Sequence, residues 1–548
     1  MINDAAAGPA RPAPAIPAPG APLAAGPTTW PARPAPRRYE DPAVLAARAG
    51  ADPARPRWHV TAPYGWLNDP NGLSLWPGPD GSPRLHLFYQ ANPAAPVHDR
   101  IHWGHQVSED LVTWRDLPIA LSPDEIGPDS HGCWSGVIVN DNGAPTAVYS
   151  GNAAQPTQVC RLARGDASDP DLVSWNKEPG ALIAGPPPGL DVLEMRDHSV
   201  WHEDGRWWQI MGSGLPGLGG AALAYSSTDL LHWRWEGVLA VGDGECDGVR
   251  ATATVWECPE LITLESADGS PVDVLLVCPW DAGRTLRSVW MTGARHGARM
   301  EIGLVGSQDL GENYFYAPQS TLLPDGRRIM IGWMQSALDK ERAMAAGWSG
   351  SMSIPREVGL AEDGTLRYRP IAELERLRGR QVAHAEDERA TGLVARGRSL
   401  DIGLSGRLGD APLVIDALAS DDGERRTRIT VRRRPARGIA PGAVGQEAWA
   451  GWLEVDRSAS AVPGSPIILT DTRLLAGEVP LGGDGAIDMR ILIDRSSLEV
   501  FVNGQPLSAR VGSDPGDDAV VIRSGLEGAR IEAWEVGPAY GDRLVPMA

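Results

Sequence analysis

A motif that returns at nearly equal intervals limits the folds open to this chain. S-x-D-L-x-x-W occurs at Ser108–Trp114 and again at Ser227–Trp233, and a close relative without the serine lies between them at Asp169–Trp175. The tryptophans that end these three copies are 61 and 58 residues apart, and a weaker copy begins at Ser307. A fixed period of this length is typical of proteins in which one supersecondary unit is repeated.

The segments between the copies have the pattern of short strands. From Trp58 onward, runs rich in β-branched and aromatic residues alternate with Gly, Asp, Asn and Pro, as in Leu85–Tyr89 and Trp207–Met211. A repeated unit of short strands is typical of β-propeller blades, and the interval from Trp58 to about Tyr368 has room for five. The alternative is a turn with an aromatic anchor that recurs by chance, and the near-equal spacing argues against it.

The rest of the chain divides around this repeat. Residues 1–37 are rich in Ala, Pro and Gly and are predicted to form a disordered leader, because they offer little apolar surface to bury. Residues 38–370 are predicted to form the propeller, and the charged stretch 371–380 a short linker. Residues 381–548 alternate strand-like runs with polar turns, which indicates a β-sandwich. The expected fold class is therefore all-β, a five-bladed β-propeller followed by a C-terminal β-sandwich.

Charge and composition exclude several classes of binding partner. The formal net charge of −20 argues against nucleic-acid partners and anionic membrane surfaces, since both are bound through clustered Lys and Arg. No run approaches the ~18 apolar residues of a membrane span. The five cysteines are scattered, without a C-x-x-C, and the first residues lack the basic n-region expected of a signal peptide. We expect a cytoplasmic protein whose partner is a small neutral molecule such as a carbohydrate. The oligomeric state stays open.

Three acidic residues in separate repeats are candidates for one site. Asp69 lies in W-L-N-D-P-N-G, a turn-forming sequence that fixes a carboxylate beside an indole. Asp197 and Glu257 follow in later repeats. The innermost strand of each propeller blade lines the central channel, so acids far apart in sequence can converge at one end of it. Convergent carboxylates are typical of glycoside chemistry.

Nine short motifs carry a more specific resemblance. In chain order they are W-L-N-D-P-N-G, F-Y-Q, H-W-G-H, W-S-G, R-D, W-E-C-P, F-Y-A-P-Q, G-W-M and P-R-E, at residues 66–72, 88–90, 102–105, 134–136, 196–197, 256–259, 315–319, 332–334 and 355–357. With D-R-S-S-L-E-V-F-V-N-G at 494–504, they resemble the motifs of glycoside hydrolase family 32, which contains invertases, sucrose-6-phosphate hydrolases, levanases and inulinases. The resemblance runs from about Trp58 to the end and leaves the leader out.

The resemblance implies a retaining fructoside hydrolase. Its catalytic residues would be Asp69 as nucleophile, Glu257 as general acid/base and Asp197 as the residue that stabilises the transition state. Glu257 must then hold a proton near neutral pH, whereas the neighbouring Arg196 is expected to keep Asp197 ionised. By the same resemblance, six residues would surround the fructose: Trp66, Asn68, Gln90, Trp103, Ser135 and Arg196.

Sucrose is the substrate expected first, cleaved through a covalent fructosyl-aspartyl intermediate. One alternative is a fructan hydrolase or a fructosyltransferase, since a sugar can accept the fructosyl group in place of water. Another, from a different class, is a non-catalytic sugar-binding or sensor protein on the same scaffold. We expect no metal and no other cofactor. Whether the substrate carries a 6-phosphate is left open.

Several polar residues have simpler explanations than a second site. His98, His102 and His105 lie close together, but no cysteine or acidic pattern completes a tetrahedral metal set. Cys258, beside Glu257, is interpreted as a buried structural cysteine rather than a thiol nucleophile.

Two further features lead to predictions about placement and pH dependence. Asp494 and Glu499 are expected on solvent-facing positions and turns of the sandwich strands. His198 stands where the family usually has proline after R-D, and its imidazole is expected to shift the pH profile.

Overall fold

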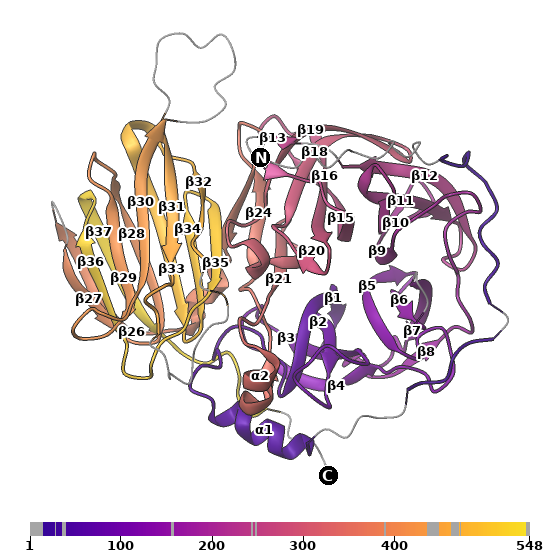
Figure 1. The fold of residues 1–548 in the computed structure, drawn as a ribbon, viewed down its shortest axis with the longest axis horizontal. Coiled ribbons are helices and arrows are strands. Elements are labelled where there is room, and N and C mark those ends of the chain that lie inside the picture. The colour runs from indigo at the N-terminus through magenta and orange to yellow at the C-terminus, as the bar shows by residue number, and fades with distance from the viewer. Residues whose placement is uncertain are drawn as a thin grey trace, which may run out of the picture.

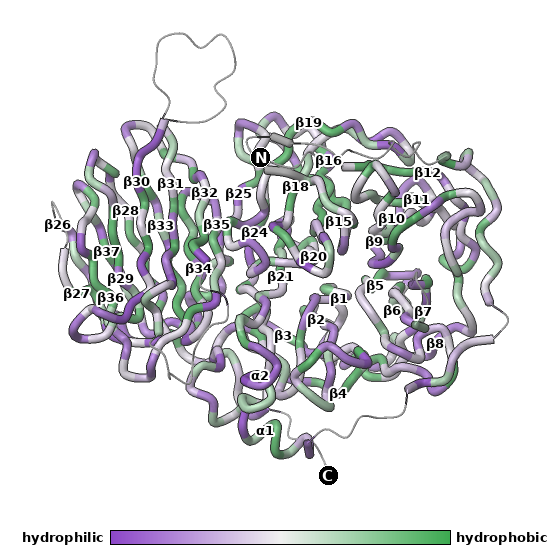
Figure 2. The backbone as a smooth tube through the Cα atoms, viewed as in Figure 1, coloured by the Kyte–Doolittle hydropathy of each residue, from purple (hydrophilic) through white to green (hydrophobic). Residues whose placement is uncertain are grey.

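Five sheets of the computed structural model stand around a common channel, and two further sheets pack together beside them (Figure 1). The structure describes residues 15–27, 29–34, 40–154, 158–242, 245–246, 249–387, 391–435, 449–461, 471 and 473–543. Hydrophobic stretches follow the strands of both parts and alternate with hydrophilic ones (Figure 2). The predicted all-β fold, a five-bladed propeller with a C-terminal sandwich, is confirmed.

The first three blades are antiparallel sheets of consecutive strands. Their strands are β1 (Gly65–Pro77), β2 (Pro83–Asn92), β3 (His102–Ser108), β4 (Arg115–Leu121), β5 (Gly132–Asp141), β6 (Ala144–Asn152), β7 (Val159–Gly165), β8 (Trp175–Lys177), β9 (Met195–Glu203), β10 (Arg206–Leu215), β11 (Gly219–Ser227) and β12 (Trp233–Val241). A separate hairpin, β13 (Glu245–Cys246) and β14 (Val249–Arg250), follows the third blade.

The last two blades carry short additional strands. Their strands are β15 (Val255–Glu265), β16 (Pro271–Asp281), β17 (Arg284–Thr285), β18 (Val289–His296), β19 (Arg299–Ser307), β20 (Tyr316–Leu322), β21 (Arg328–Met334), β23 (Ser351–Met352), β24 (Arg356–Leu360) and β25 (Leu366–Pro370). The short strand β22 (Trp348–Ser349), which follows β21 of the last blade in the chain, pairs in parallel with β1 and joins the sheet of the first blade, which closes the ring.

The sandwich consists of two six-stranded sheets, in the orders β26-β37-β28-β33-β34-β35 and β27-β36-β29-β30-β31-β32. The 3-10 turn η2 (Ala372–Leu377) leads into it, η3 (Gly483–Gly485) lies between β32 and β33 within it, and η1 (Glu312–Tyr314) lies in the propeller between β19 and β20. Its strands are β26 (Arg378–Asp387), β27 (Gly392–Arg396), β28 (Ser399–Arg407), β29 (Leu413–Ala419), β30 (Thr427–Pro435), β31 (Trp449–Asp456), β32 (Leu475–Val479), β33 (Ala486–Asp494), β34 (Ser497–Val502), β35 (Gln505–Arg510), β36 (Ala519–Ser524) and β37 (Glu527–Val536).

The repeated motif is the turn between the third and fourth strands of each of the first three blades. The Asp110 carboxylate accepts hydrogen bonds from the backbone amides of Val112 (3.1 Å) and Thr113 (2.7 Å). Asp229 caps the corresponding amides of the third blade at 2.9 and 2.8 Å. The hydrogen bonds that stabilise this turn join residues close together in the chain, so the same short motif can form it at the same place in each blade. The weaker copy at Ser307 differs, because it follows the outermost strand of the fourth blade.

Two α-helices lie side by side below the first blade (Figure 1). α1 (Pro42–Ala51) is capped by Asp41, whose side chain accepts from the amide of Ala43 at 2.8 Å. α2 (Lys340–Ala346) ends at Gly347, which has the left-handed φ of 79° that favours glycine. Within the described residues, no helix combines the length and apolar character needed to cross a membrane.

The described part of the leader, residues 15–27 and 29–34, lies along the outside of the propeller (Figure 1). The amide of Gly20 donates to the carbonyl of Trp235 at 2.7 Å, and the Trp235 indole donates to the carbonyl of Pro17 at 3.1 Å. Farther along, the amide of Arg33 donates to the carbonyl of Glu125 at 2.6 Å. Composition predicts disorder for residues 1–37, of which 1–14, 28 and 35–37 lie outside the described residues; the described part makes these contacts with the propeller. A proline-rich segment is already extended, so docking costs it little conformational entropy.

Buried charges join the sandwich to the propeller, which corrects the prediction for Asp494 and Glu499. The Asp494 carboxylate accepts hydrogen bonds from the backbone amides of residues 57–59 at 2.8 to 2.9 Å. His59 lies between the two acids, with Nδ1 2.9 Å from Asp494 and Nε2 3.0 Å from Glu499. Glu499 also accepts from Arg356 at 2.5 Å, and all four side chains are fully buried. Partners supplied by the other domain allow these carboxylates to leave solvent.

Candidate active site

The innermost strand of every blade changes register where it passes the centre of the ring. The irregularities fall between Leu67 and Pro70, Cys133 and Gly136, Glu257 and Glu260, Tyr316 and Gln319, and opposite Met211 and Gly212 in the strand pair that carries Asp197. A β-bulge breaks the strict alternation of side chains and turns one of them toward a new direction. Asp69, Asp197 and Glu257 all lie at such bulges, and Asp197 has a φ of 60°.

These three acids line one cavity of about 610 Å³, which we call the acid cavity. The predicted residues Trp66, Asn68, Gln90 and Arg196 line it too. The structure therefore brings together side chains from the first, third and fourth blades in one cavity.

Ser135 and Trp103 lie behind the cavity wall in different ways. The Ser135 hydroxyl donates to Asp69 Oδ2 at 2.6 Å, so it touches the site through that carboxylate. Trp103 is fully buried, and its indole donates to the carbonyl of Trp134 at 3.0 Å. The structure thus places Trp103 under the wall residue Trp134 rather than beside a bound sugar.

Asp69 is held in one orientation by three donors. Besides Ser135, the amide of Gln90 donates to Oδ2 at 2.9 Å, and the Cys258 thiol lies 3.5 Å from the same oxygen. Burial raises the pKa of Asp69 to about 6, and the charge of Glu257 adds to the rise, while the hydrogen bond from Ser135 opposes it.

Glu257 is held from both sides. Arg196 donates to Oε1 through Nε and Nη2 at 3.0 and 2.9 Å, and the Tyr316 hydroxyl donates to Oε2 at 2.5 Å. Arg196 also donates to Glu194 at 2.8 Å and lies over the Trp280 ring, 5.7 Å from its centre. This guanidinium is thus fully engaged inside the cavity.

Arg196 does not hold Asp197 ionised as the sequence neighbours suggest. The Asp197 carboxylate accepts instead from the amide and thiol of Cys258, at 3.0 and 3.4 Å. Burial raises the pKa of Asp197 to about 7, because the opposing charge of Arg196 is offset by those of Glu257 and Asp69. Both side chains line the acid cavity, but the hydrogen bonds of the Arg196 guanidinium go to Glu257 and Glu194 instead of Asp197.

Cys258 contacts two of the three acids, which its sequence position alone does not show. Its backbone has a left-handed φ of 44°, and burial raises the pKa of its thiol well above the ordinary range. The group therefore stays a protonated donor rather than a nucleophilic thiolate.

Several lining residues escaped the sequence prediction. They are His98, Trp134, Gln158, Glu194, Trp280, Thr285, Tyr316 and Trp333. Trp134, Tyr316 and Trp333 lie in the quoted motifs W-S-G, F-Y-A-P-Q and G-W-M and were identifiable there, and Glu194 stands two residues before R-D. The others reach the cavity through the tertiary fold.

The three histidines of the sequence cluster separate in the structure. His98 packs edge-on against Trp66 and Trp134, with ring centres 6.0 and 5.8 Å apart, while His105 faces His86 at 2.9 Å inside the first blade. In the part of the chain that the structure describes, no group of three or more His, Cys, Asp or Glu side chains is placed to hold a metal ion.

His198 is a buried neutral residue. Its Nδ1 lies 3.0 Å from Oε1 of Gln209, and burial lowers the pKa of its imidazole to about 4. It therefore stays uncharged near neutral pH, and the expected shift of the pH profile has no titrating group behind it.

Comparison with known proteins gives matches over both domains. Residues 59–370 match the family described as "Glycosyl hydrolases family 32 N-terminal domain", and residues 373–530 match "Glycosyl hydrolases family 32 C terminal". The sucrose-6-phosphate hydrolase of Klebsiella pneumoniae is 31% identical over 500 residues, 88% of this chain and 93% of that protein.

One further relative and one solved structure are also similar to this chain. The sucrose-6-phosphate hydrolase of Escherichia coli is 34% identical over 336 residues, 59% of this chain and 66% of that protein, so the match spans just under two thirds of its length. The crystal structure of fructan 1-exohydrolase IIa from Cichorium intybus superposes with a TM-score of 0.76 at 25% identity, over 90% of this chain and 99% of that one.

Proposed function

The chain belongs to glycoside hydrolase family 32, and we propose that it is a retaining β-fructofuranosidase that releases the terminal fructosyl unit of sucrose. The observation that carries the proposal is the meeting of Asp69, Asp197 and Glu257 in one cavity. Two opposed carboxyl groups and a third beside them are what a double displacement at a fructoside needs.

In the proposed first step, Asp69 attacks the anomeric carbon of the fructosyl unit. The bond from that carbon to the glycosidic oxygen breaks, and Glu257 gives its proton to the departing oxygen. Ser135 and Gln90 support this role, because their hydrogen bonds fix the carboxylate of Asp69 and favour its ionised form.

In the second step, water attacks the same carbon and the bond to Asp69 breaks. Glu257 takes the proton of that water and is ready for another cycle. Arg196 and Tyr316 stabilise the Glu257 carboxylate in the interval when it has lost its proton.

Asp197 is proposed to stabilise the transition state. It comes from the third blade, which precedes the blade that carries Glu257, and we expect it to accept hydrogen bonds from fructose hydroxyls. These bonds strengthen as positive charge develops on the sugar ring.

The charge of the cavity favours a neutral substrate. The carboxylates of Asp69, Glu194, Asp197 and Glu257 line it, and the only guanidinium among its described lining residues, Arg196, is already engaged. A phosphate group is bound by charge-assisted donors, which this lining does not offer. We therefore propose sucrose rather than sucrose 6-phosphate, although several relatives are named for the phosphorylated sugar.

A fructan is the second candidate substrate, and one observation favours it. A neighbouring cavity of about 930 Å³ shares Gly283, Thr285 and Trp333 with the acid cavity and continues to Asp471 and Arg473 of the sandwich. Additional sugar units of a longer substrate would have space there.

A product assay on sucrose, sucrose 6-phosphate, inulin and levan tests the proposal. We expect fructose release from sucrose to exceed that from sucrose 6-phosphate by at least about tenfold, about 1.4 kcal/mol. Asp69→Asn should lower release by at least about a thousandfold, since a neutral amide is a poor nucleophile, while the surface control Asp80→Asn keeps it. Full activity of Asp69→Asn would remove the proposed nucleophile, and a preference for inulin or levan would select the second candidate.

A further inference from the structure

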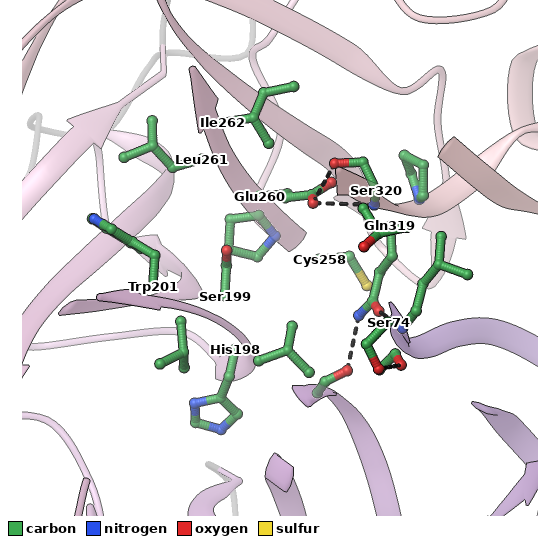
Figure 3. Close-up of a pocket in the computed structure, with 18 of the residues that line it drawn as sticks. Ser74, His198, Ser199, Trp201, Cys258, Glu260, Leu261, Ile262, Gln319 and Ser320 are labelled. Carbon is green, nitrogen blue, oxygen red and sulfur yellow. Dashed lines mark hydrogen bonds between the residues drawn. The ribbon is translucent and has the colours of Figure 1, made fainter. Parts of the chain in front are cut away.

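A second cavity of about 390 Å³ occupies the same channel on the far side of the acids (Figure 3). The five innermost strands contribute to both cavities, with their earlier residues at the acid cavity and their later residues here. On β15, Glu257 faces the acid cavity and residues 258–263 face the second one; on β20 the change comes after Tyr316. We call this second space the rear cavity. Asp197 lines both cavities.

The rear cavity holds polar atoms that the protein itself leaves without a partner. Glu260 Oε1 accepts from the amide and the hydroxyl of Ser320 at 3.1 and 2.7 Å (Figure 3), but its Oε2 is buried without a hydrogen-bond partner in the described structure. Arg328 donates to the same Ser320 hydroxyl at 3.0 Å through Nη1, and its buried Nε has no hydrogen-bond partner among the described residues. Buried donors and acceptors without partners are costly, so a bound molecule that pairs with them is favoured.

Charge indicates which class of molecule fits. Four carboxylates and two guanidinium groups line the rear cavity, from Asp197, Glu203, Glu260, Asp273, Arg295 and Arg328. Arg295 already donates to Glu203 at 2.6 Å. The excess of carboxylates disfavours an anion. A metal ion is disfavoured as well, because the described side chains provide no grouping that would hold one. A neutral molecule with hydroxyl groups satisfies both Glu260 and Arg328, because a hydroxyl both donates and accepts.

Size and walls agree with a small sugar-like ligand. The volume lies near the lower end of the roughly 300–1,000 Å³ usual for ligand pockets. Ser199 and Trp201 project from β9 beside the space (Figure 3), and Leu322, 56% exposed, marks the end of β20 that is open to solvent. The cavity therefore combines polar groups for hydroxyls with apolar surface for a sugar ring and a route from outside.

We propose that the rear cavity is a second binding site, for a neutral polyhydroxylated molecule of monosaccharide size. Its hydroxyls donate to Glu260 Oε2 and accept from Arg328 Nε. This site is separate from the proposed sucrose site and does not rest on the proposed function.

A calorimetric titration of the full chain tests the site. The probe is D-xylose, added to Asp69→Asn protein with and without saturating sucrose. We expect one D-xylose per chain in both cases, because sucrose occupies only the acid cavity. Glu260→Gln keeps the side-chain volume but replaces one carboxyl oxygen with an NH2 group, which cannot accept a hydrogen bond, and should weaken D-xylose binding by about tenfold or more. Glu265→Gln, an exposed acid on the same strand, is the matched control and should leave binding unchanged.

Ser199→Phe provides a second variant, because its ring would fill the space and abolish D-xylose binding. A melting curve shows whether this variant folds, and Glu260→Gln decides the question if it does not. Absence of D-xylose binding, its displacement by sucrose, or equal affinity in Glu260→Gln and its parent would each overturn the proposal. Failure of sucrose to bind would count against the proposed function only, since the D-xylose titration without sucrose still reports on the rear cavity.

Discussion

The thiol of Cys258 lies 3.5 Å from Oδ2 of Asp69, although the two residues are 189 positions apart in the chain. The bulge after Glu257 makes this contact possible, because it turns Cys258 toward the first blade. The same thiol lies 3.4 Å from Asp197. One donor thereby fixes the positions of two acids relative to each other.

Cys258→Ala should lower kcat/KM for sucrose by about tenfold, because two carboxylates lose a donor that orients them. Steady-state kinetics measures the effect. Cys160→Ala, another buried cysteine but in the second blade, should leave kcat/KM within about twofold, since changes remote from the site rarely alter it. Equal effects of the two substitutions would show that Cys258 matters only for packing.

The pKa of Asp69, about 6, predicts the acidic side of the pH profile. A nucleophile must be ionised, so kcat/KM should fall as the pH drops below about 6. Ser135→Ala removes a hydrogen bond that lowers the pKa of Asp69, so the fall should begin at a higher pH. Profiles of kcat/KM between pH 4 and 8 test this. If the acidic side of the pH profile does not move in Ser135→Ala, the role given to this hydroxyl is wrong.

His59 should make the stability of the protein depend on pH. Burial disfavours its charged form, but the hydrogen bonds and charges of Asp494 and Glu499 outweigh burial and raise its pKa above 6.5. A raised pKa gives stabilisation that is complete below the unfolded value, near 6.5, and is lost as the pH rises through the folded value. Urea unfolding at pH 5.5, 7 and 8.5 should show the parent losing stability toward alkaline pH relative to His59→Gln.

The size of the His59 effect can be measured with a second substitution. His59→Ala leaves two buried carboxylates short of a partner and should cost about 3–5 kcal/mol of unfolding free energy. His232→Ala, an exposed histidine paired with Asp229, should cost less than about 1 kcal/mol. A parent protein whose stability rises from pH 6.5 to 8.5 relative to His59→Gln would contradict the assignment of charge to His59.

His198→Pro should leave the pH optimum unchanged, because the imidazole is neutral above its pKa of about 4. The substitution removes a backbone N–H from the pairing of β9 with β10, so we expect a lower melting temperature. His198→Gln keeps that N–H and serves as the control. Rate profiles and melting curves of both variants separate the two effects, and a displaced optimum in both would restore a titrating role for this position.

Local sequence was enough to predict the blades and the meeting of the acids. The turn at Asp110 is stabilised by amides two and three residues away, so a local sequence motif is enough to identify it. Predictions failed where the deciding partner is distant. Asp494 looks like an exposed turn residue until residues 57–59, more than 400 positions earlier, supply its hydrogen bonds. Arg196 stands next to Asp197 in the chain, yet its side chain pairs with Glu257 of another blade.

The buried contacts of His59 and Arg356 with Glu499 have a consequence for how the molecule loses its structure. If the sandwich detached, His59 would lose both of its acidic partners, and Arg356 would lose Glu499 and keep only Asp309 of the propeller. Neither half is therefore a complete folding unit, and we expect a single cooperative transition in place of stepwise melting. A protease that clips the connection between the halves should leave them associated until denaturant is added.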